Sequence, residues 1–468
     1  MPVWDSLKNT VAEEISLREQ QGCSVGELRK EFGAAGEDES ALRAVYGKLT
    51  ALKPSADFPY IEPDEYEEIV KDSRFSDSVL TDGDLLYDKM YGGWLGRCIG
   101  CNLGKPLERD PFVCGDEKRH GWEHVRKYFE GAGAYPIDGY VPEFSEYTKE
   151  CGRAISHPIC RNSTRENVRF AEGDDDIRYS IIGMLLFEKK GYDFRTLDVV
   201  TEWTARLTAR QICTAEEQAY INFCLAFPSV CTPDYEQFDA KLPEIREKDN
   251  PYREYLGARI RVDGYSMCAP NMPVAATKMA YQDAILSHER NGVYSAIYAS
   301  ALISLAYAEK DVRTLVRKAM TAVPARSRLY EAISYAFELV DRYDDFCDIA
   351  EAIWRKYEKC SWIHSLNNDC LLTAALLYSQ GDFEKGITNA VLGGLDTDCN
   401  GATVGCILGV LNGAEKIPEK WKAPLHDTIV TEMCGVGTIA ISECAERCFA
   451  AVCGRNPSIR TGKGCKND

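Results

Sequence analysis

Apolar residues along most of this chain recur at three- and four-residue intervals, the spacing that places them on one face of an α-helix. Residues 177–191, 294–311 and 370–382 show the pattern most clearly, and loops rich in Gly, Pro and Asp separate such segments. The alternation that is typical of strands is suggested only by one short piece at 258–262. The pattern therefore predicts an all-α fold.

The pattern changes along the chain in a way that indicates separate regions. Residues 1–80 predict short polar helices and a proline-bearing connector, which we interpret as a helical N-terminal extension. Long apolar helices follow, so residues 81–455 are expected to form the main domain, and residues 456–468 a flexible tail. Residues 105–170 are rich in Gly, Pro and charge and predict a long irregular segment, which is usually functional or covers a site.

Two of the predicted helices carry glycine at every fourth position. These glycines are Gly92, Gly96, Gly100 and Gly104 in one helix, and Gly401, Gly405 and Gly409 in the other. Each glycine destabilises a helix by roughly 1 kcal/mol relative to alanine, so a ridge of them indicates close approach of another backbone or of a ligand. The second helix is far too short to span a membrane. We expect tight helix packing in a protein core.

Composition and charge narrow the class of protein. Hydrophobic residues make up 45% of the chain and charged residues 27%, which is ordinary for a globular protein. The net charge of −18 argues against a nucleic-acid-binding surface. An acidic balance is compatible with a metal enzyme, although a merely acidic surface explains it equally well.

Targeting and cysteine patterns favour a cytoplasmic protein. The first residues lack the layout of a signal peptide, and no apolar run is long enough for a membrane span, so no membrane partner is expected. We interpret the 20 cysteines as mostly reduced, buried thiols. Cys98 and Cys101 form a CxxC pair, which alone is a weak zinc signal; three-residue spacing on one helix face favours core packing instead.

The first acidic motif, EGDDD at residues 172–176, stands directly before an apolar helix. One aspartate there is explained as a helix cap, because free N–H groups and the helix dipole stabilise a carboxylate. Capping does not explain three consecutive aspartates, since only one caps and the others repel each other. A bound cation would relieve that repulsion, and oxygen ligands favour a hard ion such as Mg²⁺, Mn²⁺ or Ca²⁺.

The second acidic motif, GGLDTDCNGA at residues 393–402, is also a glycine-rich turn that leads into an apolar helix. The alternate positions Asp396 and Asp398 can face a common ion. A single DxD motif is more often a solvated turn than a metal site. Two acidic turns, each at the head of an apolar helix that contains glycine, indicate a metal site much more strongly.

Together with residues 92–108 and 287–307, these two motifs resemble the ADP-ribosylglycohydrolase family in order and approximate spacing, over about residues 85–455. The resemblance implies a compact orthogonal multi-helix bundle with two Mg²⁺ ions in a cleft, Mn²⁺ being a possible replacement. Residues 81–455 would then be the catalytic domain. That family hydrolyses glycosidic bonds at the C1″ carbon of ADP-ribose, which implies a glycoside hydrolase that binds ADP-ribose or an ADP-ribosylated substrate.

The resemblance also implies roles for individual residues. The metal ligands it indicates are Asp174, Asp175, Asp176, Asp396, Asp398 and Cys399. Asp174 and Cys399 replace hydroxyl ligands of the family, and sulfur is a poor ligand for magnesium. Gly104 stands where many members carry a glutamate, so Glu108, one turn later, is the predicted substitute. Asp175, Asp176 and Glu108 are the catalytic candidates, because a carboxylate without another task can accept a proton from water.

The substrate-binding residues are also assigned from the resemblance. They are His288, Asn291, Gly292, Tyr265, Gly394, Asn400 and Gly401. His288 stands in a polar run before a helix, where N–H groups favour a phosphate. Residues 262–273 resemble a loop that covers the cleft, with Tyr265 placed to stack on a base or ribose. Residues 362–369 are expected to bring His364 or Asn368 nearby.

Two other functions remain open at this point. A glycohydrolase or nucleosidase that acts on another ribosyl compound would share the metal site and differ only in its pocket. A degenerated relative that binds ADP-ribose without hydrolysis is favoured by Gly104 and Cys399, whereas the two intact aspartate motifs argue against it.

Overall fold

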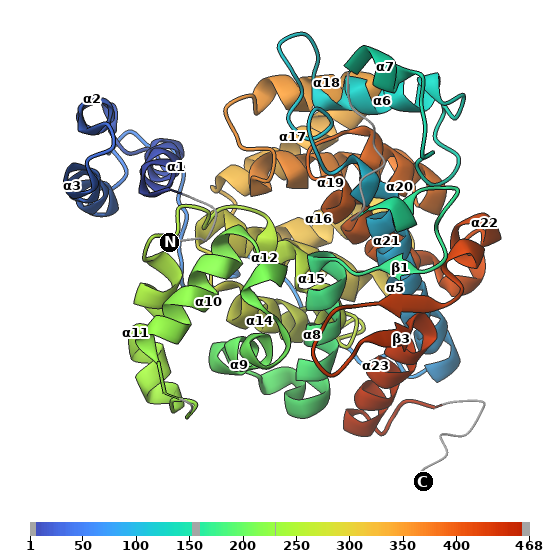
Figure 1. Cartoon of the computed structure of the whole chain (residues 1–468). Coiled ribbons are helices and arrows are strands. Elements are labelled where there is room, and N and C mark those ends of the chain that lie inside the picture. Colours follow the sequence, from blue (N-terminus) through green and yellow to red (C-terminus); the bar gives the residue numbers. More distant parts are fainter. Residues whose placement is uncertain (1–5, 152–159, 230, 461–468) are drawn as a thin grey trace.

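The structure is a computed structural model that describes residues 6–151, 160–229 and 231–460. This part of the chain is mostly helical (Figure 1), as the periodicity predicts. The first helices are α1 (Leu7–Gln20), α2 (Gly26–Ala35), α3 (Glu39–Thr50), α4 (Tyr66–Ile69), α5 (Gly83–Gly104), α6 (Gly121–Gly131), α7 (Tyr147–Cys151), α8 (Asp175–Lys190), α9 (Thr196–Arg206), α10 (Thr214–Ala226), α11 (Tyr235–Glu247) and α12 (Gly257–Ile260).

The second half of the chain continues in the same way. Its helices are α13 (Asp263–Ser266), α14 (Pro273–Ala284), α15 (Arg290–Ala306), α16 (Val312–Ala319), α17 (Arg328–Arg342), α18 (Phe346–Lys356), α19 (Ser365–Ser379), α20 (Phe383–Leu392), α21 (Thr397–Asn412), α22 (Glu419–Lys422) and α23 (Ile441–Arg455). A small sheet contains β1 (Ala171–Glu172), β2 (Thr428–Val430) and β3 (Thr438–Ala440) in that order. β1 runs parallel to β2, and β2 runs antiparallel to β3.

The strand suggested at residues 258–262 is wrong, because α12 covers most of this segment. Ala258, Ile260 and Val262 alternate with Arg259 and Arg261, and all five side chains are buried. Alternation indicates a strand only when the polar residues face solvent. Here the two arginines are buried in ion pairs with carboxylates instead.

Helices α5 and α21 pack backbone against backbone through their glycines. A Cβ atom added at Gly96 would lie 1.9 Å from the carbonyl oxygen of Gly405, and one at Gly100 would lie 1.9 Å from that of Gly401. The expectation of close helix packing is therefore confirmed. The contact also brings the end of α5 to the start of α21, where the Thr397 hydroxyl donates to the Gly104 carbonyl at 2.9 Å.

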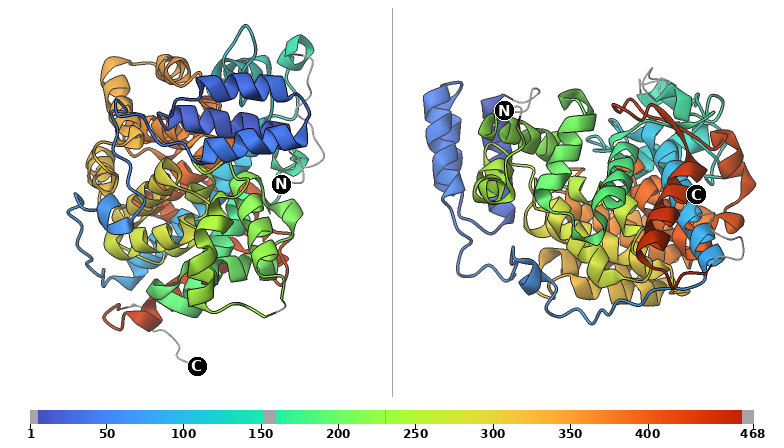
Figure 2. Two further views of the ribbon diagram at one scale, coloured as in Figure 1. Left: turned by 90° about the vertical axis from the view of Figure 1, so that its left-hand side faces the viewer. Right: turned by 90° about the horizontal axis from the view of Figure 1, so that it is seen from below.

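The first three helices form a unit with an apolar core of its own, which includes Val11, Leu42 and Leu49. The unit lies at one side of the main body, and the connector that follows runs along that body to α5 (Figure 2). Its contacts with the main body are polar: for example, Arg43 pairs with Asp249 at 2.6 Å.

Two other regions differ from the sequence pattern or extend it. The segment 105–170 was expected to be irregular, but it contains α6 and α7; residues 152–159 lie outside the described part. Of the predicted tail, residues 456–460 are described, and Arg460 exchanges backbone hydrogen bonds with Thr81 and Gly83; residues 461–468 lie outside the described part. No helix among the described residues is long and apolar enough to cross a bilayer.

Candidate metal centre and adjoining cavity

The first acidic motif lies where β1 ends and α8 begins. Asp174 is the N-cap of α8 and accepts a hydrogen bond from the backbone N–H of Asp176 at 3.3 Å. Its other carboxylate oxygen lies 2.8 Å from Nζ of Lys105, which follows α5 directly. Burial alone would raise the pKa of Asp174, but the charge of Lys105 holds it below its usual value. Asp174 therefore remains ionised without any bound ion.

Asp176 is buried, and each of its two carboxylate oxygens has a partner. The Arg97 guanidinium contacts one of its oxygens at 2.7 Å, and the Cys399 thiol donates to the other at 3.0 Å. Burial raises the pKa of Asp176 to about 7, although the charge of Arg97 opposes this shift. Cys399 and Asp176 are 223 positions apart in sequence, so this contact joins the two acidic motifs.

The second acidic motif begins with a strained turn, in which Gly394 and Leu395 have positive φ. A side chain at Gly394 would also meet the Phe112 carbonyl at 2.8 Å, so glycine is required there on both grounds. Asp396 then caps α21 by accepting from the Cys399 N–H at 3.3 Å. The turn thus places Asp396 and Asp398 at the head of α21, beside the end of α5.

Asp398 is the most exceptional carboxylate of the group. Its side chain is buried, and its Oδ1 has no hydrogen-bond partner among the described residues. Burial and the neighbouring charges of Glu108 and Asp396 raise its pKa well above the usual value. A buried carboxylate oxygen without a partner is costly, and a cation is the ligand that would satisfy it.

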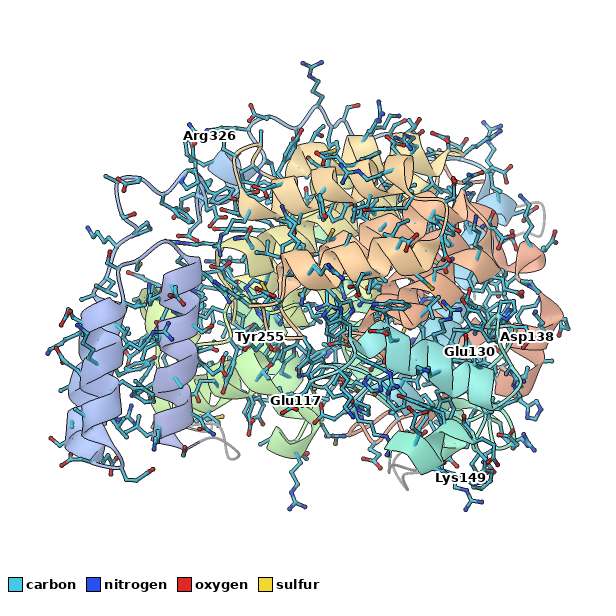
Figure 3. All side chains as sticks on the ribbon, turned by 90° about the horizontal axis from the view of Figure 1, so that it is seen from above. Glu117, Glu130, Asp138, Lys149, Tyr255 and Arg326 are labelled. Carbon is cyan, nitrogen blue, oxygen red and sulfur yellow. The ribbon has the colours of Figure 1, made fainter. Side chains whose placement is uncertain are left out.

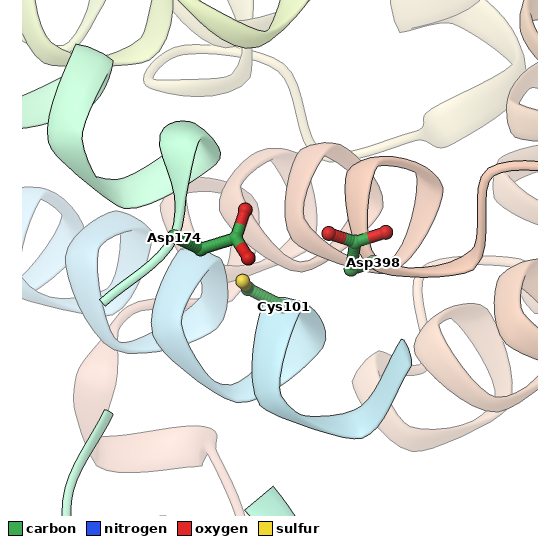
Figure 4. A group of neighbouring side chains, drawn as sticks. All are labelled: Cys101, Asp174 and Asp398. Atoms are coloured by element: carbon green, nitrogen blue, oxygen red, sulfur yellow. The ribbon is translucent and has the colours of Figure 1, made fainter. Parts of the chain in front are cut away.

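The ligand atoms of the two motifs converge into small groups. Within each group, all ligand atoms lie within 4.8 Å of one another. The groups are Glu108 with Asp396 and Asp398, Asp174 with Asp175 and Asp176, Asp176 with Asp398 and Cys399, and Cys101 with Asp174 and Asp398. Figure 4 shows the last of these, with the two carboxylates and the thiol near one another. Asp398 belongs to three of the four groups and therefore links the motifs.

We name this set the acidic centre; its carboxylates are Glu108, Asp174, Asp175, Asp176, Asp396 and Asp398. The ion pairs found among the described residues give these six groups two cations, Lys105 and Arg97. Two cations beside six carboxylates leave an excess of negative charge. Desolvation and the charge of Asp174 accordingly raise the pKa of Asp175 well above its usual value. Divalent cations fit this donor set, because carboxylate oxygens are their preferred ligands.

A cavity of about 370 Å³ adjoins the acidic centre. Glu108, Asp175, Asp396 and Cys399 line one part of it. Its remaining wall is formed by Tyr179, Cys213, Thr214, Glu216, Tyr255, Leu256, Gly257, Ile260, Trp362 and Ile363. The cavity therefore combines a carboxylate-rich wall with aromatic and aliphatic surface, the combination expected of a small-molecule site.

Tyr255 connects this cavity to the N-terminal unit. Its hydroxyl donates to the Glu13 carboxylate of α1 at 3.1 Å, and Figure 3 shows it on the side of the body that faces those helices. Glu13 and Tyr255 also line a second cavity of about 290 Å³.

Two residues that were expected to bind substrate, Asn400 and Gly401, pack next to the acidic centre and do not face the cavity. Asn400 is buried, donates to Asn368 at 2.8 Å and accepts from Arg259 at 2.8 Å. Asn368 also accepts from the backbone N–H of Asp396 at 3.3 Å. Gly401 packs on Gly100, where a Cβ would lie 2.5 Å from the carbonyl oxygen. Neither Asn400 nor Gly401, nor Gly394, is among the residues that line the cavity.

The block around His288 lies in a different place from the one expected. His288 is buried, and its Nδ1 contacts the Ser287 hydroxyl at 2.8 Å. Asn291 donates to Glu62 and Glu254, each at 2.9 Å. Gly292 packs on the backbone of Arg253. These three residues therefore join a buried polar network, and the structure does not bring them to the cavity.

Residues 262–273, which were expected to form a loop that covers the cleft, begin with α13 and are mostly buried. The Tyr265 hydroxyl donates to Asp283 at 3.0 Å, and its ring packs edge-on against Phe194. Since the ring is fully enclosed, no face is left on which a base or ribose could stack.

Several residues of the centre were not found from the sequence. Lys105 and Arg97 were missed because a lone basic residue in a helix carries no signal of its buried partner. Cys101 is buried in the core, as its spacing to Cys98 predicted, but the sequence did not indicate that its thiol also lies near Asp174 and Asp398. Its neighbour Gly100, which contacts the head of α21, was the available signal that this helix face meets the second acidic motif.

The sequence profile of ADP-ribosylglycohydrolase matches residues 82–457. Because the match covers most of the chain, this protein belongs to the ADP-ribosylglycohydrolase family. One solved structure, described as an ADP-ribosylglycohydrolase-related protein complex, is similar with a TM-score of 0.45 and 17% identity, over 79% of this chain and 98% of that chain. No curated protein matches the sequence.

Proposed function

We propose that this protein hydrolyses the glycosidic bond at the ribose C1″ carbon of an ADP-ribosylated protein or small acceptor, with a binuclear metal centre that contains Mg²⁺. The observation that carries the proposal is the acidic centre itself. Two aspartate motifs, distant in sequence, converge with an excess of buried negative charge beside a cavity of about 370 Å³. Membership of the family supplies the substrate class.

The residues that would hold the ions are Asp174, Asp175, Asp176, Asp396, Asp398 and Cys399. When bound, such ions orient the ribose hydroxyls and lower the pKa of a water molecule. Asp174 and Asp176 are already held by Lys105 and Arg97, respectively, so their geometry is fixed before any ligand arrives. Fixed ligands favour catalysis because little reorganisation is needed when the substrate binds.

The proton acceptor is best assigned to a carboxylate that faces the cavity. Asp175 and Glu108 both line it, whereas Asp176 is engaged by Arg97 and Cys399. We therefore retain Asp175 and Glu108 as the bases that hold the proton of the attacking water, and we assign Asp176 to metal binding.

The cavity wall opposite the carboxylates suits the rest of the substrate. Tyr255 and Trp362 present aromatic surface, and Leu256, Ile260 and Ile363 add aliphatic surface. Aromatic rings bind sugar and base faces through dispersion and burial of apolar area. We assign this wall to the ribose and its attached groups.

The proposal is tested by measuring hydrolysis of ADP-ribosylated arginine, serine and small acceptors, with Mg²⁺ and after chelation. We expect release of ADP-ribose that requires metal and is lost in Asp175→Asn. Asp138→Asn is the matched control, because Asp138 is exposed and pairs with Arg165 at the surface. Metal-dependent binding of ADP-ribose without hydrolysis of any substrate would indicate the degenerated relative, and cleavage of other ribosyl compounds alone would indicate a different glycohydrolase. Absence of any response to ADP-ribose in a thermal-shift titration would contradict the proposal.

A further inference from the structure

Two buried thiols lie within the acidic centre and come from different helices. Cys101 is in the last turn of α5, and its Sγ lies within 4.8 Å of an oxygen of Asp174 and an oxygen of Asp398 (Figure 4). Cys399 is in the first turn of α21, and its Sγ lies within 4.8 Å of an oxygen of Asp176 and an oxygen of Asp398. Each thiol thus completes a three-atom group with two carboxylates.

Burial alone does not account for this placement. Cys98 lies one turn before Cys101 on the same helix, and it is equally buried. All three cysteines belong to the same buried core cluster, but Cys98 belongs to no metal-ligand group among the described residues. The two thiols of the centre are therefore distinguished from ordinary core cysteines by their carboxylate neighbours.

Asp398 gives an independent indication that a ligand completes these groups. It is shared by both thiol-containing groups, and its Oδ1 is buried without a partner in the described part of the chain. It also belongs to the group with Glu108 and Asp396, which contains oxygen ligands alone. Asp398 therefore belongs both to groups that contain sulfur and oxygen ligands and to a group that contains oxygen ligands alone.

We propose that Cys101 and Cys399 are metal ligands, and that they make one position of the centre selective for a thiol-binding divalent ion of the Zn²⁺ type. Asp396 and Asp398 also belong to a group of oxygen ligands alone, and this part of the centre keeps the preference for Mg²⁺. This proposal rests on the metal centre of the proposed function and adds the identity of one ion. Thiolate ligands favour Zn²⁺ and related ions, whereas Mg²⁺ favours carboxylate and water.

The chemistry of binding is a simple exchange of a proton for a metal ion. Each thiol loses its S–H proton to solvent as a metal–sulfur bond forms, and no electron is transferred. The buried carboxylates around each sulfur disfavour an isolated thiolate, but a divalent cation reverses this effect because its charge is the largest in the site. Loss of one direct ligand is expected to weaken binding by about tenfold or more, at least the effect of losing an outer-shell partner.

The test uses Co²⁺ as a probe on the full-length protein after treatment with a chelator. A Co²⁺–thiolate bond gives a charge-transfer absorption that oxygen ligands do not give. We expect this band in wild type and in Cys98→Ser, the matched control on the same helix. Cys101→Ser and Cys399→Ser should each weaken the band, and the double variant should lose it. Zn²⁺ should displace Co²⁺ at stoichiometric amounts, whereas Mg²⁺ should not displace it even in excess.

The outcomes separate this proposal from the proposed function. A band that persists in the double variant would assign the sulfur to other cysteines and overturn the proposal. Absence of the band in wild type, while Mg²⁺ still raises the melting temperature, would overturn the thiol assignment and leave the metal centre intact. Absence of both would contradict the proposed function itself. Circular dichroism of each variant checks that the loss of signal is not a loss of folding.

Discussion

The acidic centre and a second buried cluster of charged residues differ in how their buried carboxylates are compensated. The second cluster, which we name the paired network, joins the N-terminal helices, the connector and the main body. Its members are Glu14, Gln21, Glu62, Arg253, Glu254, Glu289, Asn291 and Arg328. Arg328 contacts Glu62 at 2.6 Å and Glu254 at 2.8 Å, and Arg253 contacts Glu289 at 3.1 Å.

The pKa shifts express the difference between the two clusters. In the paired network, burial would raise the pKa of Glu289, but Arg253 lowers it to about 2. In the acidic centre, burial and neighbouring carboxylates raise the pKa of Asp398 and Asp175. Buried charge is costly unless it is paired. A cluster that pairs its own charges is structural, whereas one that leaves them unpaired indicates a ligand from outside.

The largest expected effect is on hydrolysis. Asp398→Asn should lower kcat/KM by more than about a hundredfold, since it removes a direct ligand rather than an outer-shell partner. The stability of the metal-free protein should be unchanged or higher, because one of several repelling charges is removed. Steady-state kinetics and urea unfolding measure the two quantities. A large loss of stability together with normal activity would mean that Asp398 belongs to a structural cluster.

In the paired network, we expect a substitution to lower the stability of the protein and to leave metal binding unchanged. Glu254→Gln leaves Arg328 and its neighbours with one charge fewer, and breaking a buried pair costs about 3–5 kcal/mol of unfolding free energy. Stabilisation by Mg²⁺ should remain. The control is Glu37→Gln, an exposed partner of Lys8, for which a change of about 0–1 kcal/mol is expected. Equal effects of the two substitutions in urea unfolding would show that the network is not a stabilising element.

The glycine contact that joins α5 to α21 should have an intermediate effect. In Gly100→Ala the new methyl group would meet the Gly401 backbone, and overpacking of this kind costs about 1–3 kcal/mol. Metal affinity should fall as well, because the contact sets the distance between the two motifs. Gly33→Ala in α2, where nothing lies within 4 Å, should instead stabilise by about 0.5–1 kcal/mol. Thermal unfolding with and without Mg²⁺ would compare the two variants. A Gly100→Ala variant that is as stable as wild type would contradict the close packing of α5 on α21.

A further effect concerns the pH dependence of stability. The pKa of Asp176 is raised to about 7 in the folded protein, so its contribution to the stability of the metal-free protein is complete below pH 4. That contribution is lost as pH rises from about 4 to about 7. Mg²⁺ binds the ionised carboxylate, so its stabilising effect should grow over the same range, by about 1.4 kcal/mol per pH unit for each proton displaced. A thermal shift by Mg²⁺ that does not depend on pH would contradict this.

The sequence was sufficient for the fold class and for finding the two acidic motifs that the fold brings together, because both signals are local. Three consecutive aspartates before a helix, and two more in a glycine-rich turn, are unusual enough to indicate a site without knowledge of the fold. The glycine ridges predicted close helix packing, and the structure shows that α5 and α21 are the helices that pack on each other. This contact brings the head of α21, with Asp398, to the end of α5, where Lys105 pairs with Asp174.

Residues whose roles depend on long-range partners could not be assigned in this way. His288 stands in a polar run before a helix, and only the fold shows that this helix begins inside the paired network. Arg259 and Arg261 looked like the polar face of a strand because their buried carboxylate partners are distant in sequence. Helix α6 was missed although its buried residues, which include His124, Val125, Tyr128 and Phe129, recur at helical intervals. The Gly, Pro and charge of the surrounding segment 105–170 were given more weight than this short periodic stretch.

The central claim is that the two aspartate motifs form one metal centre, and metal content tests it most directly. Equilibrium dialysis would compare bound divalent metal in wild type, Asp175→Asn, Asp398→Asn and the double variant. Each single substitution should remove most of the bound metal, and the double variant should be little worse than either single, because residues that act as a unit are strongly non-additive. Metal content that stays at the wild-type level in both single variants, with independent and additive losses of activity, would contradict the claim.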